Sequence, residues 1–395
     1  MKARDRVLRE LDHEEPDKIP WFELSIDNLK ICDHYSEGYY LQGMAKSFAD
    51  TYNLCRGIID EFTNTILAAT ESRSYLKNTI KQYLGLFSKI GIDLAQIPLS
   101  GYIFFPTFCM KEGFIDEYGR IFELKKNPSD NMDIAYYKDG YFKSIEDFEK
   151  LSLLDPDNPR RKRIYDMMKK VEKEFEGNIA VIPTIWGIFE SSWQAFGFTQ
   201  FSKLLIGKKF AKKVIDKYGN FALELAKRLI EWGESTAIML FDDLGFKSGL
   251  LTNPNNYKEI LFPWYEKLCN YCHSKGINVL FHSCGDLEPI FGDLVKVGFD
   301  AIHPIEPTTA NPKYDIFKLH ERYGNDVTFI GNVSPQDLAD KEPIFIKEYS
   351  KKLIRALGPG GGYIFSSGHS INPSVKLENF LAMVSTREEE GIYPQ

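Results

Sequence analysis

A histidine and a cysteine stand two residues apart at the end of an apolar run. The motif FHSCGD occupies residues 281–286 and follows the short β-branched run 277–280. Such a run predicts a buried strand whose last residues emerge into a loop. Because side chains alternate along a strand, His282 and Cys284 point the same way. An imidazole and a thiol at this spacing can bind one borderline cation, usually zinc, although a buried histidine beside an inert core cysteine gives the same pattern.

The elements that position this pair are predicted from a repeated alternation of short apolar runs with helical patterns. Eight such runs occur, at residues 18–24, 91–97, 180–185, 237–241, 277–281, 299–305, 327–332 and 362–366. Strands that alternate with helices favour parallel βαβ units, and eight of them in 395 residues indicate an α/β fold of the (β/α)8 TIM barrel type. We therefore expect a single barrel domain over residues 1–395 with an N-terminal helical extension.

One stretch interrupts this rhythm after the second predicted strand. Residues 102–142 contain turn signals, at 118–120 and 138–141, between short β-like runs. We interpret this stretch as a β-hairpin insertion that forms a movable rim of the barrel mouth.

A barrel of this type places its site at the C-terminal ends of its strands. The polar and aromatic residues that follow the predicted strands are Glu23, Ser25, Trp186, Phe189, Glu190, Asp242, Asp243, His282, Cys284, Asp286, His303, Glu306, Asn332, Ser334, Ser367 and His369. Any one of them alone is typical of a loop residue that faces water. Histidines, a cysteine and several carboxylates that converge on one rim together predict a metal site.

Composition and charge narrow the functional classes. The net charge is −7 and no basic block occurs, which argues against a nucleic-acid partner. No apolar run approaches the roughly 18 residues of a membrane helix, and the charged N-terminus is unlike a signal peptide. Six scattered cysteines do not make a disulfide framework and fit a reducing compartment. We therefore expect a globular cytoplasmic protein, and a homodimer is one assembly that the sequence allows.

Several motifs resemble one superfamily and occur in its order. They are DDLG at residues 242–245, FHSCGD at 281–286, HPIEP at 303–307, GNV at 331–333 and GGGYI at 360–364. Together with RVL at 6–8 and EPDKIP at 15–20, they resemble the uroporphyrinogen decarboxylase superfamily. The resemblance covers nearly the whole chain and implies a (β/α)8 barrel, in agreement with the strand count.

Two branches of that superfamily differ just after the first strand. The decarboxylases carry an arginine-rich stretch there that binds substrate carboxylates, whereas this chain has FELSID at residues 22–27. Because arginine is suited to bidentate carboxylate binding, its absence argues against a porphyrinogen substrate. The other branch resembles zinc methyltransferases that exchange methyl groups with a corrinoid protein. That branch uses a His-x-Cys pair, often with a later cysteine, and related enzymes add a glutamate from the next strand.

The resemblance thus implies a zinc site made by His282, Cys284 and Glu306, with His369 as a fourth ligand or a proton donor. The later cysteine is missing, since SSGH occupies residues 366–369. A zinc ion with one thiolate is a stronger Lewis acid than one with two, and suits an ether or alcohol oxygen.

We therefore expect an O-demethylase-type methyltransferase. It would pass a methyl group from a methoxylated aromatic compound, or from another small methyl donor, to the cob(I)alamin of a partner corrinoid protein. The alternatives are a methylcobamide:thiol methyltransferase, a decarboxylase-like lyase and a non-catalytic tetrapyrrole-binding member of the same superfamily.

The remaining expectations concern acid chemistry and substrate contact. Cleavage of an O–methyl bond leaves an oxyanion that must be protonated or held by the metal, so Asp242 and Asp243 are candidate acids. Adjacent side chains of a strand point to opposite faces, so only one of them should enter the site. A structural role in capping a loop is the alternative for this pair. The residues expected to contact substrate are Trp186, Phe189, Glu190 and Glu23.

Overall fold

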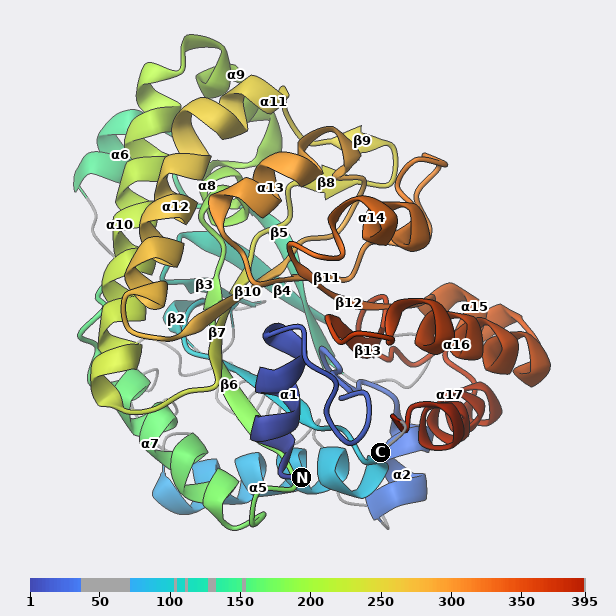
Figure 1. Cartoon of the computed structure of the whole chain (residues 1–395). Coiled ribbons are helices and arrows are strands. Elements are labelled where there is room, and N and C mark those ends of the chain that lie inside the picture. Colours follow the sequence, from blue (N-terminus) through green and yellow to red (C-terminus); the bar gives the residue numbers. More distant parts are fainter. Residues whose placement is uncertain (37–71, 103–104, 111–112, 127–132, 151–153, 394–395) are drawn as a thin grey trace.

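A parallel sheet curls around the centre of the molecule (Figure 1). The computed structural model describes residues 1–36, 72–102, 105–110, 113–126, 133–150 and 154–393. Within these ranges, seven strands pair in parallel in the order β1-β6-β7-β10-β11-β12-β13. Their bounds are β1 (Leu94–Pro98), β6 (Ala180–Trp186), β7 (Ala237–Phe241), β10 (Asn278–His282), β11 (Ala301–His303), β12 (Thr328–Val333) and β13 (Tyr363–Ser367).

The first predicted strand joins the two edges of this sheet. Trp21 makes a parallel bridge to Phe365 of β13, and Phe22 makes one to Leu94 of β1. The Phe22 N–H donates to the Phe365 carbonyl at 2.9 Å, and the Leu94 N–H donates to the Trp21 carbonyl at 3.0 Å. The described residues therefore form the (β/α)8 barrel that the eight apolar runs predict.

Every second residue of the strands fills the barrel interior. The inner cluster includes Phe22, Leu94, Ile182, Met239, Leu280, Ala301, Ile330 and Ile364. Their neighbours, such as Val181, Leu240 and Phe281, belong to the larger cluster between the sheet and the helices. Because both faces of the strands are buried, the sequence shows continuous apolar runs instead of an alternating pattern.

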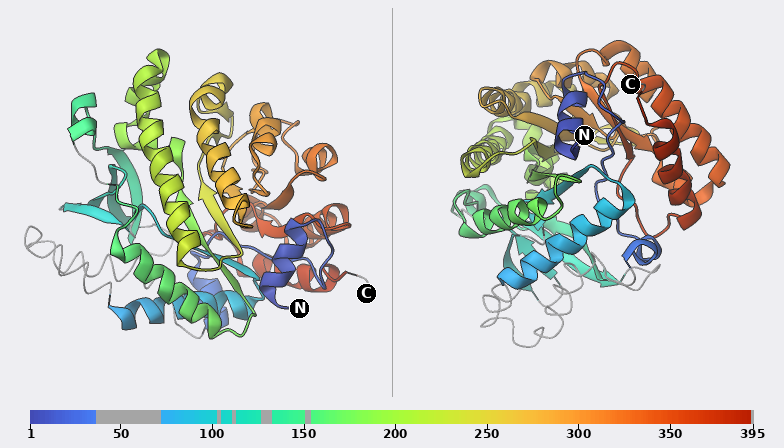
Figure 2. Two further views of the ribbon diagram at one scale, coloured as in Figure 1. Left: turned by 60° about the vertical axis from the view of Figure 1, so that its left-hand side comes forward. Right: turned by 60° about the horizontal axis from the view of Figure 1, so that its bottom comes forward.

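Helices surround the sheet in the views of Figures 1 and 2. The longer ones are α5 (Arg73–Ile90), α7 (Pro159–Lys173), α10 (Lys209–Trp232), α12 (Phe262–His273), α16 (Pro343–Leu357) and α17 (Leu377–Glu390). The shorter ones are α2 (Leu29–Ser36), α6 (Ile145–Lys150), α8 (Ile188–Phe196), α9 (Phe198–Gly207), α11 (Pro254–Asn256), α13 (Phe291–Val297), α14 (Ile316–Tyr323) and α15 (Pro335–Asp340). In the described part of the chain, no helix combines the length and apolar character needed to cross a bilayer.

The predicted N-terminal helix, α1 (Ala3–Leu11), packs under the barrel. Ala3, Val7 and Leu11 belong to the same cluster as the barrel interior. The right-hand view of Figure 2 shows α1 lying within the ring of helices. This helix therefore covers the N-terminal end of the barrel and leaves the opposite end for a site.

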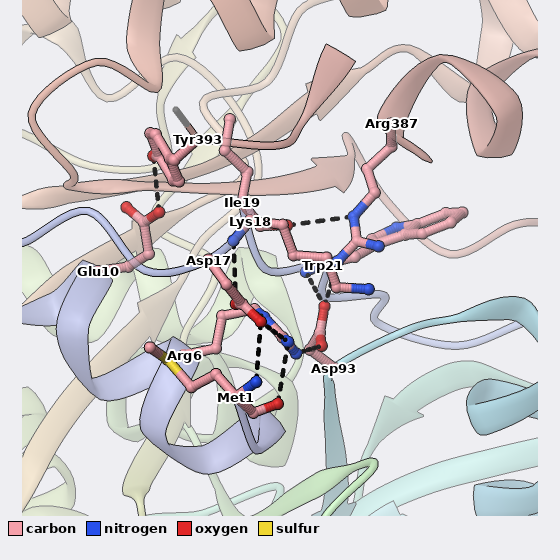
Figure 3. A network of polar contacts seen from close by, with 10 residues as sticks. All are labelled: Met1, Arg6, Glu10, Asp17, Lys18, Ile19, Trp21, Asp93, Arg387 and Tyr393. Atoms are coloured by element: carbon pink, nitrogen blue, oxygen red, sulfur yellow. Dashed lines mark hydrogen bonds and ion pairs between the residues drawn. The ribbon is translucent and has the colours of Figure 1, made fainter. Parts of the chain in front are cut away.

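A buried ionic network lies beside α1 (Figure 3). The Asp93 carboxylate accepts from Arg6 Nη1 at 2.5 Å and from Arg387 Nη2 of α17 at 2.5 Å. It also accepts from the Trp21 N–H at 3.0 Å. One carboxylate thus links α1, the strand segment that closes the barrel, and α17.

The insertion after β1 contains more strands than the single hairpin expected. Among the described residues it forms a four-stranded antiparallel sheet of β2 (Pro106–Met110), β3 (Gly113–Asp116), β4 (Arg120–Lys126) and β5 (Asp133–Gly140). The Phe142 N–H donates to the Ala195 carbonyl of α8 at 3.0 Å, and Tyr137 Oη donates to the Gln194 carbonyl at 2.9 Å. These contacts attach the insertion to α8, and movement of this rim stays a prediction.

Candidate metal centre

Three side chains with metal-binding atoms meet at the C-terminal end of the barrel. The ligand atoms of Asp243, His282 and Cys284 all lie within 4.8 Å of one another. His282 Nε2 lies 3.6 Å from Cys284 Sγ and 3.8 Å from Asp243 Oδ1. The imidazole is buried, whereas the thiol and the carboxylate are half-buried. The predicted histidine–cysteine pair therefore does converge, and a carboxylate joins it.

Two loops are tied together to form this cluster. His282 ends β10, and Asp243 follows β7, the neighbouring strand. The Cys284 N–H donates to Asp243 Oδ1 at 2.8 Å. Gly285 has φ 90°, and a Cβ atom there would lie 2.2 Å from the Gly245 carbonyl carbon. Only glycine therefore allows the loop after Cys284 to approach the loop after Asp243 so closely.

The spacing of the cysteine sulfur and the histidine nitrogen fits zinc. Bond lengths of about 2.3 Å to sulfur and about 2.05 Å to nitrogen, at a tetrahedral angle, separate the two ligand atoms by about 3.5 Å. The observed distance between Cys284 Sγ and His282 Nε2 is 3.6 Å. One nitrogen, one sulfur and one oxygen donor form a set that zinc accepts, with a fourth position for solvent or substrate.

The charges around Cys284 also favour a cation. Burial raises the pKa of its thiol well above the usual value, and the nearby carboxylates of Asp243, Glu306 and Glu190 raise it further. Burial likewise raises the pKa of Asp243. A divalent cation would offset these carboxylates and stabilise the thiolate form that binds metal.

Glu306, the predicted third ligand, lies outside this cluster of described residues. Its carboxylate accepts a hydrogen bond from Thr308 Oγ1. It is nevertheless close enough for its charge to raise the pKa of the Cys284 thiol. The carboxylate that lies within the cluster is that of Asp243, and ligation by Glu306 stays a prediction.

His369 lies on the exposed rim after β13. Its ring centroid is 6.2 Å from that of His282, at an interplanar angle of 68°. Its Nδ1 atom lies 3.0 Å from Ser370 Oγ. This place is compatible with either role predicted for it, the fourth ligand or a proton donor.

Asp242 points away from the cluster and caps a helix. Its Oδ2 atom accepts from the Ile188 and Phe189 N–H groups at 2.8 Å each, and its Oδ1 atom accepts from the Glu190 N–H at 2.6 Å. Tyr265 Oη donates to Oδ2 at 2.5 Å. Asp242 is fully buried, so its contacts favour the structural alternative over the catalytic role.

Glu190, in the first turn of α8, lies on the site side of that cap. Burial and the nearby Asp243 carboxylate raise its pKa to about 8, although Arg120 acts in the opposite direction. Glu190 Oε1 accepts from Gln194 Nε2 at 2.8 Å, and Gln194 Oε1 accepts from Arg120 Nη1 at 3.2 Å. A chain of polar contacts therefore connects the insertion with the candidate centre.

The sequence predicts that Trp186 and Phe189 both contact substrate, but the two side chains lie in different surroundings. The Trp186 ring stacks on Tyr102 at 5.8 Å and lies 4.5 Å from the Arg120 guanidinium. Phe189 is only 2% exposed and packs against Phe201 and Tyr257. Phe189 thus packs among the helices and is not a candidate for substrate contact, whereas Trp186 stays one.

Glu23 is also buried, below the site. Its Oε1 atom accepts from Trp21 Nε1 at 2.8 Å and from the Ser367 N–H at 3.0 Å, and Ser367 Oγ donates to its Oε2 atom. The side chain is fully buried, and these contacts fix the end of β13 against the closing segment. A contact between Glu23 and substrate therefore has no support in its surroundings.

His303 is the residue whose importance the sequence did not reveal. It is fully buried, and its Nδ1 atom lies 2.7 Å from His282 Nδ1. Burial lowers the pKa of both imidazoles, to about 3 for His303. The alignment of the two predicted strands could have indicated this contact, since His282 and His303 are register partners on β10 and β11.

Comparison with known proteins identifies the family of this chain. Residues 131–390 match the family model described as uroporphyrinogen decarboxylase (URO-D). The methylcobamide:CoM methyltransferase MtbA of Methanosarcina acetivorans is 22% identical over 264 residues, which cover 66% of this chain and 71% of that protein. A uroporphyrinogen decarboxylase of Rickettsia rickettsii is 30% identical over 265 residues, which cover 60% of this chain and 67% of that protein.

A solved structure has the same fold over nearly its whole length. It is a methyltransferase from Methanosarcina mazei, with a TM-score of 0.64 and 17% identity over 98% of this chain and 99% of that chain. Since the family model matches more than half of the chain, the chain belongs to the uroporphyrinogen decarboxylase family. The sequence relative from Methanosarcina acetivorans supports the methyltransferase branch that the motifs resemble.

Proposed function

We propose that this protein is a zinc-dependent methyltransferase that moves a methyl group from a small O-methyl compound to the cob(I)alamin of a corrinoid protein. The observation that carries the proposal is the convergence of Asp243, His282 and Cys284. Because this set has one sulfur donor, it favours a Lewis-acidic centre suited to an ether oxygen. Three further cysteines, Cys32, Cys269 and Cys272, are buried and lie outside this cluster.

The reaction breaks the methyl C–O bond and leaves its electron pair on the oxygen. The new C–Co bond forms with an electron pair from Co(I), and the leaving oxygen takes up a proton. Zinc, when bound, would polarise the donor's oxygen. Glu190 is protonated near neutral pH, since burial raises its pKa to about 8, and it could give that proton. Trp186 would provide an aromatic wall for an aromatic methyl donor.

A methyl-transfer assay tests this proposal. The purified protein, loaded with zinc, is mixed with cob(I)alamin and a panel of methoxylated aromatic compounds. Methylcobalamin should form, and its formation should stop after chelation of zinc and be absent with Co(II) alone. Demethylation that proceeds without any corrinoid would contradict the proposal.

A second candidate is a methylcobamide:thiol methyltransferase, because the relative from Methanosarcina acetivorans is named a methylcobamide:CoM methyltransferase. The single cysteine in the cluster argues against this function. A zinc ion with more thiolate ligands is more electron-rich, and such an ion leaves a bound substrate thiolate more nucleophilic. Incubation with methylcobalamin and a panel of small thiols separates the two. Rapid thioether formation, without reaction of the O-methyl compounds, would favour this second function.

A further inference from the structure

We propose that His303 is a positioning residue that fixes the tautomer of His282, so that His282 Nε2 always presents a lone pair to the metal centre. The inference rests on the metal site of the proposed function, although the hydrogen-bond chain that carries it can be tested without metal. The chain runs from the end of β13 through His303 to His282, and the position of each proton follows from the partners of each atom.

The chain begins at the Nε2 atom of His303, where both neighbours are acceptors. The Ser367 carbonyl oxygen, which can only accept, lies 3.3 Å from this nitrogen. Ser366 Oγ lies 3.4 Å from it, and that hydroxyl donates its own proton to the Ser367 carbonyl at 3.0 Å. His303 Nε2 therefore carries the hydrogen.

The second step passes from His303 to His282. Both rings are buried, with exposed fractions of 0% and 5%, so each is neutral and holds a single N–H. Since the hydrogen of His303 is on Nε2, its Nδ1 atom has a lone pair. The two Nδ1 atoms are 2.7 Å apart, so the hydrogen between them belongs to His282.

The third step concerns the Nε2 atom of His282, which faces the site. With its hydrogen on Nδ1, the neutral ring leaves Nε2 bare, opposite Cys284 Sγ at 3.6 Å and Asp243 Oδ1 at 3.8 Å. A bare nitrogen and a carboxylate oxygen that face each other repel unless a cation lies between them. The tautomer thus prepares the cluster for a metal ion before the ion arrives.

Ser367 is held in place from below, which makes the chain rigid. Its N–H donates to Glu23 Oε1 at 3.0 Å, and its hydroxyl donates to Glu23 Oε2. The His303 ring also packs edge-on against Phe22, with centroids 5.3 Å apart at 85°. Glu23, expected from the sequence to contact substrate, therefore contributes through the geometry of this support.

Two substitutions at His303 separate hydrogen bonding from packing. In His303→Asn, the amide oxygen can take the place of Nδ1 and accept from His282, whereas His303→Phe keeps a ring against Phe22 but cannot accept. We expect the Phe variant to lose about 10- to 100-fold in zinc affinity and the Asn variant to stay nearer the wild type. A packing role alone predicts the reverse order. Zinc affinity is measured by competition with a chelator, and thermal unfolding of each apoprotein checks the fold.

Nitrogen NMR of the metal-free wild type tests the chain directly. With 15N-labelled histidine, we expect a scalar coupling between the two Nδ1 nuclei, the hydrogen on Nδ1 in His282 and the hydrogen on Nε2 in His303. Unchanged zinc affinity in the Phe variant, or the hydrogen on Nε2 of His282, would overturn the inference. If the wild type bound no zinc but showed the coupling, the proposed function would fail while the tautomer assignment would stand.

Discussion

Asp242 and Asp243 are consecutive, yet their carboxylates serve opposite sides of the strand end after β7. Asp242 accepts three N–H groups from the first turn of α8, whereas Asp243 accepts the Cys284 N–H and lies in the donor cluster. This division follows from the alternation of side chains along an extended backbone. The same helix carries Glu190, so the aspartate that caps α8 also places a second carboxyl group beside the centre.

The two aspartates should respond differently to the same substitution. Asp243→Asn should lower zinc affinity by more than about 100-fold, because it removes a charged donor and not merely an outer partner. Asp242→Asn should keep stoichiometric zinc but lower the free energy of unfolding by about 2 kcal/mol, because an amide NH2 group would replace one of the two oxygens that accept buried N–H and O–H groups. Metal analysis and urea unfolding measure the two quantities. Zinc loss in the Asp242 variant at unchanged stability would contradict this assignment.

Cys284 is expected to be the sulfur donor. Cys284→Ser should cut zinc occupancy sharply, and methyl transfer should fall with it. The matched control is Cys269→Ser on α12, a buried cysteine outside the cluster, which should keep full zinc even if its stability falls. Full zinc occupancy and full activity in the Cys284 variant would place the metal elsewhere.

The proton supplied to the leaving oxygen should show in the pH dependence of turnover. Burial raises the pKa of Glu190 to about 8, so the protonated acid is present below that pH and is lost above it. We expect kcat to fall as the pH rises through about 8. Glu190→Gln should retain zinc, lower kcat by about 100-fold and abolish this alkaline limb. The control Glu224→Gln on α10 should behave as wild type, and a variant at 190 with an unaltered pH profile would assign the acid role to another group.

Glu10 should make the fold less stable as the pH rises. It is fully buried beside Tyr393, and burial raises its folded-state pKa to about 8, whereas the unfolded value is near 4.3. Because the folded state binds the proton more tightly, this stabilisation is complete below about pH 4.3 and is lost between there and about pH 8. The change is on the order of 5 kcal/mol. Glu10→Gln should flatten the dependence in urea unfolding at several pH values; an equally steep slope in the variant would show that another group is responsible.

The fold could be predicted because each strand has a local signal. The eight apolar runs coincide with the seven paired strands and the closing segment, since strands buried on both faces are continuously apolar. The four strands of the insertion were underestimated, because short exposed β-ladders such as β4 and β5 mix polar and apolar residues and carry a weak pattern.

The candidate site was only partly predictable, because its composition depends on contacts between loops. His282 and Cys284 share a strand end and could be recognised together. The choice of Asp243 over Glu306 depends on a hydrogen bond to the Cys284 N–H, 41 residues away in sequence. Phe189 follows a strand as an aromatic substrate contact would, yet the direction of α8 buries it. The first turn of α8 is held by Asp242, whose side the sequence did not assign.

The position of the closing segment has a consequence for the biosynthesis of the chain. Residues 18–22 leave the ribosome long before one of their two partners, β13, because all of the residues between them are synthesised first. Arg387, which shares Asp93 with Arg6, emerges later still. Until then, the barrel has two unpaired edges, and the Asp93 carboxylate lacks one of its two arginine partners. We therefore expect a ribosome stall before β13 to expose those edges to chaperones or to aggregation.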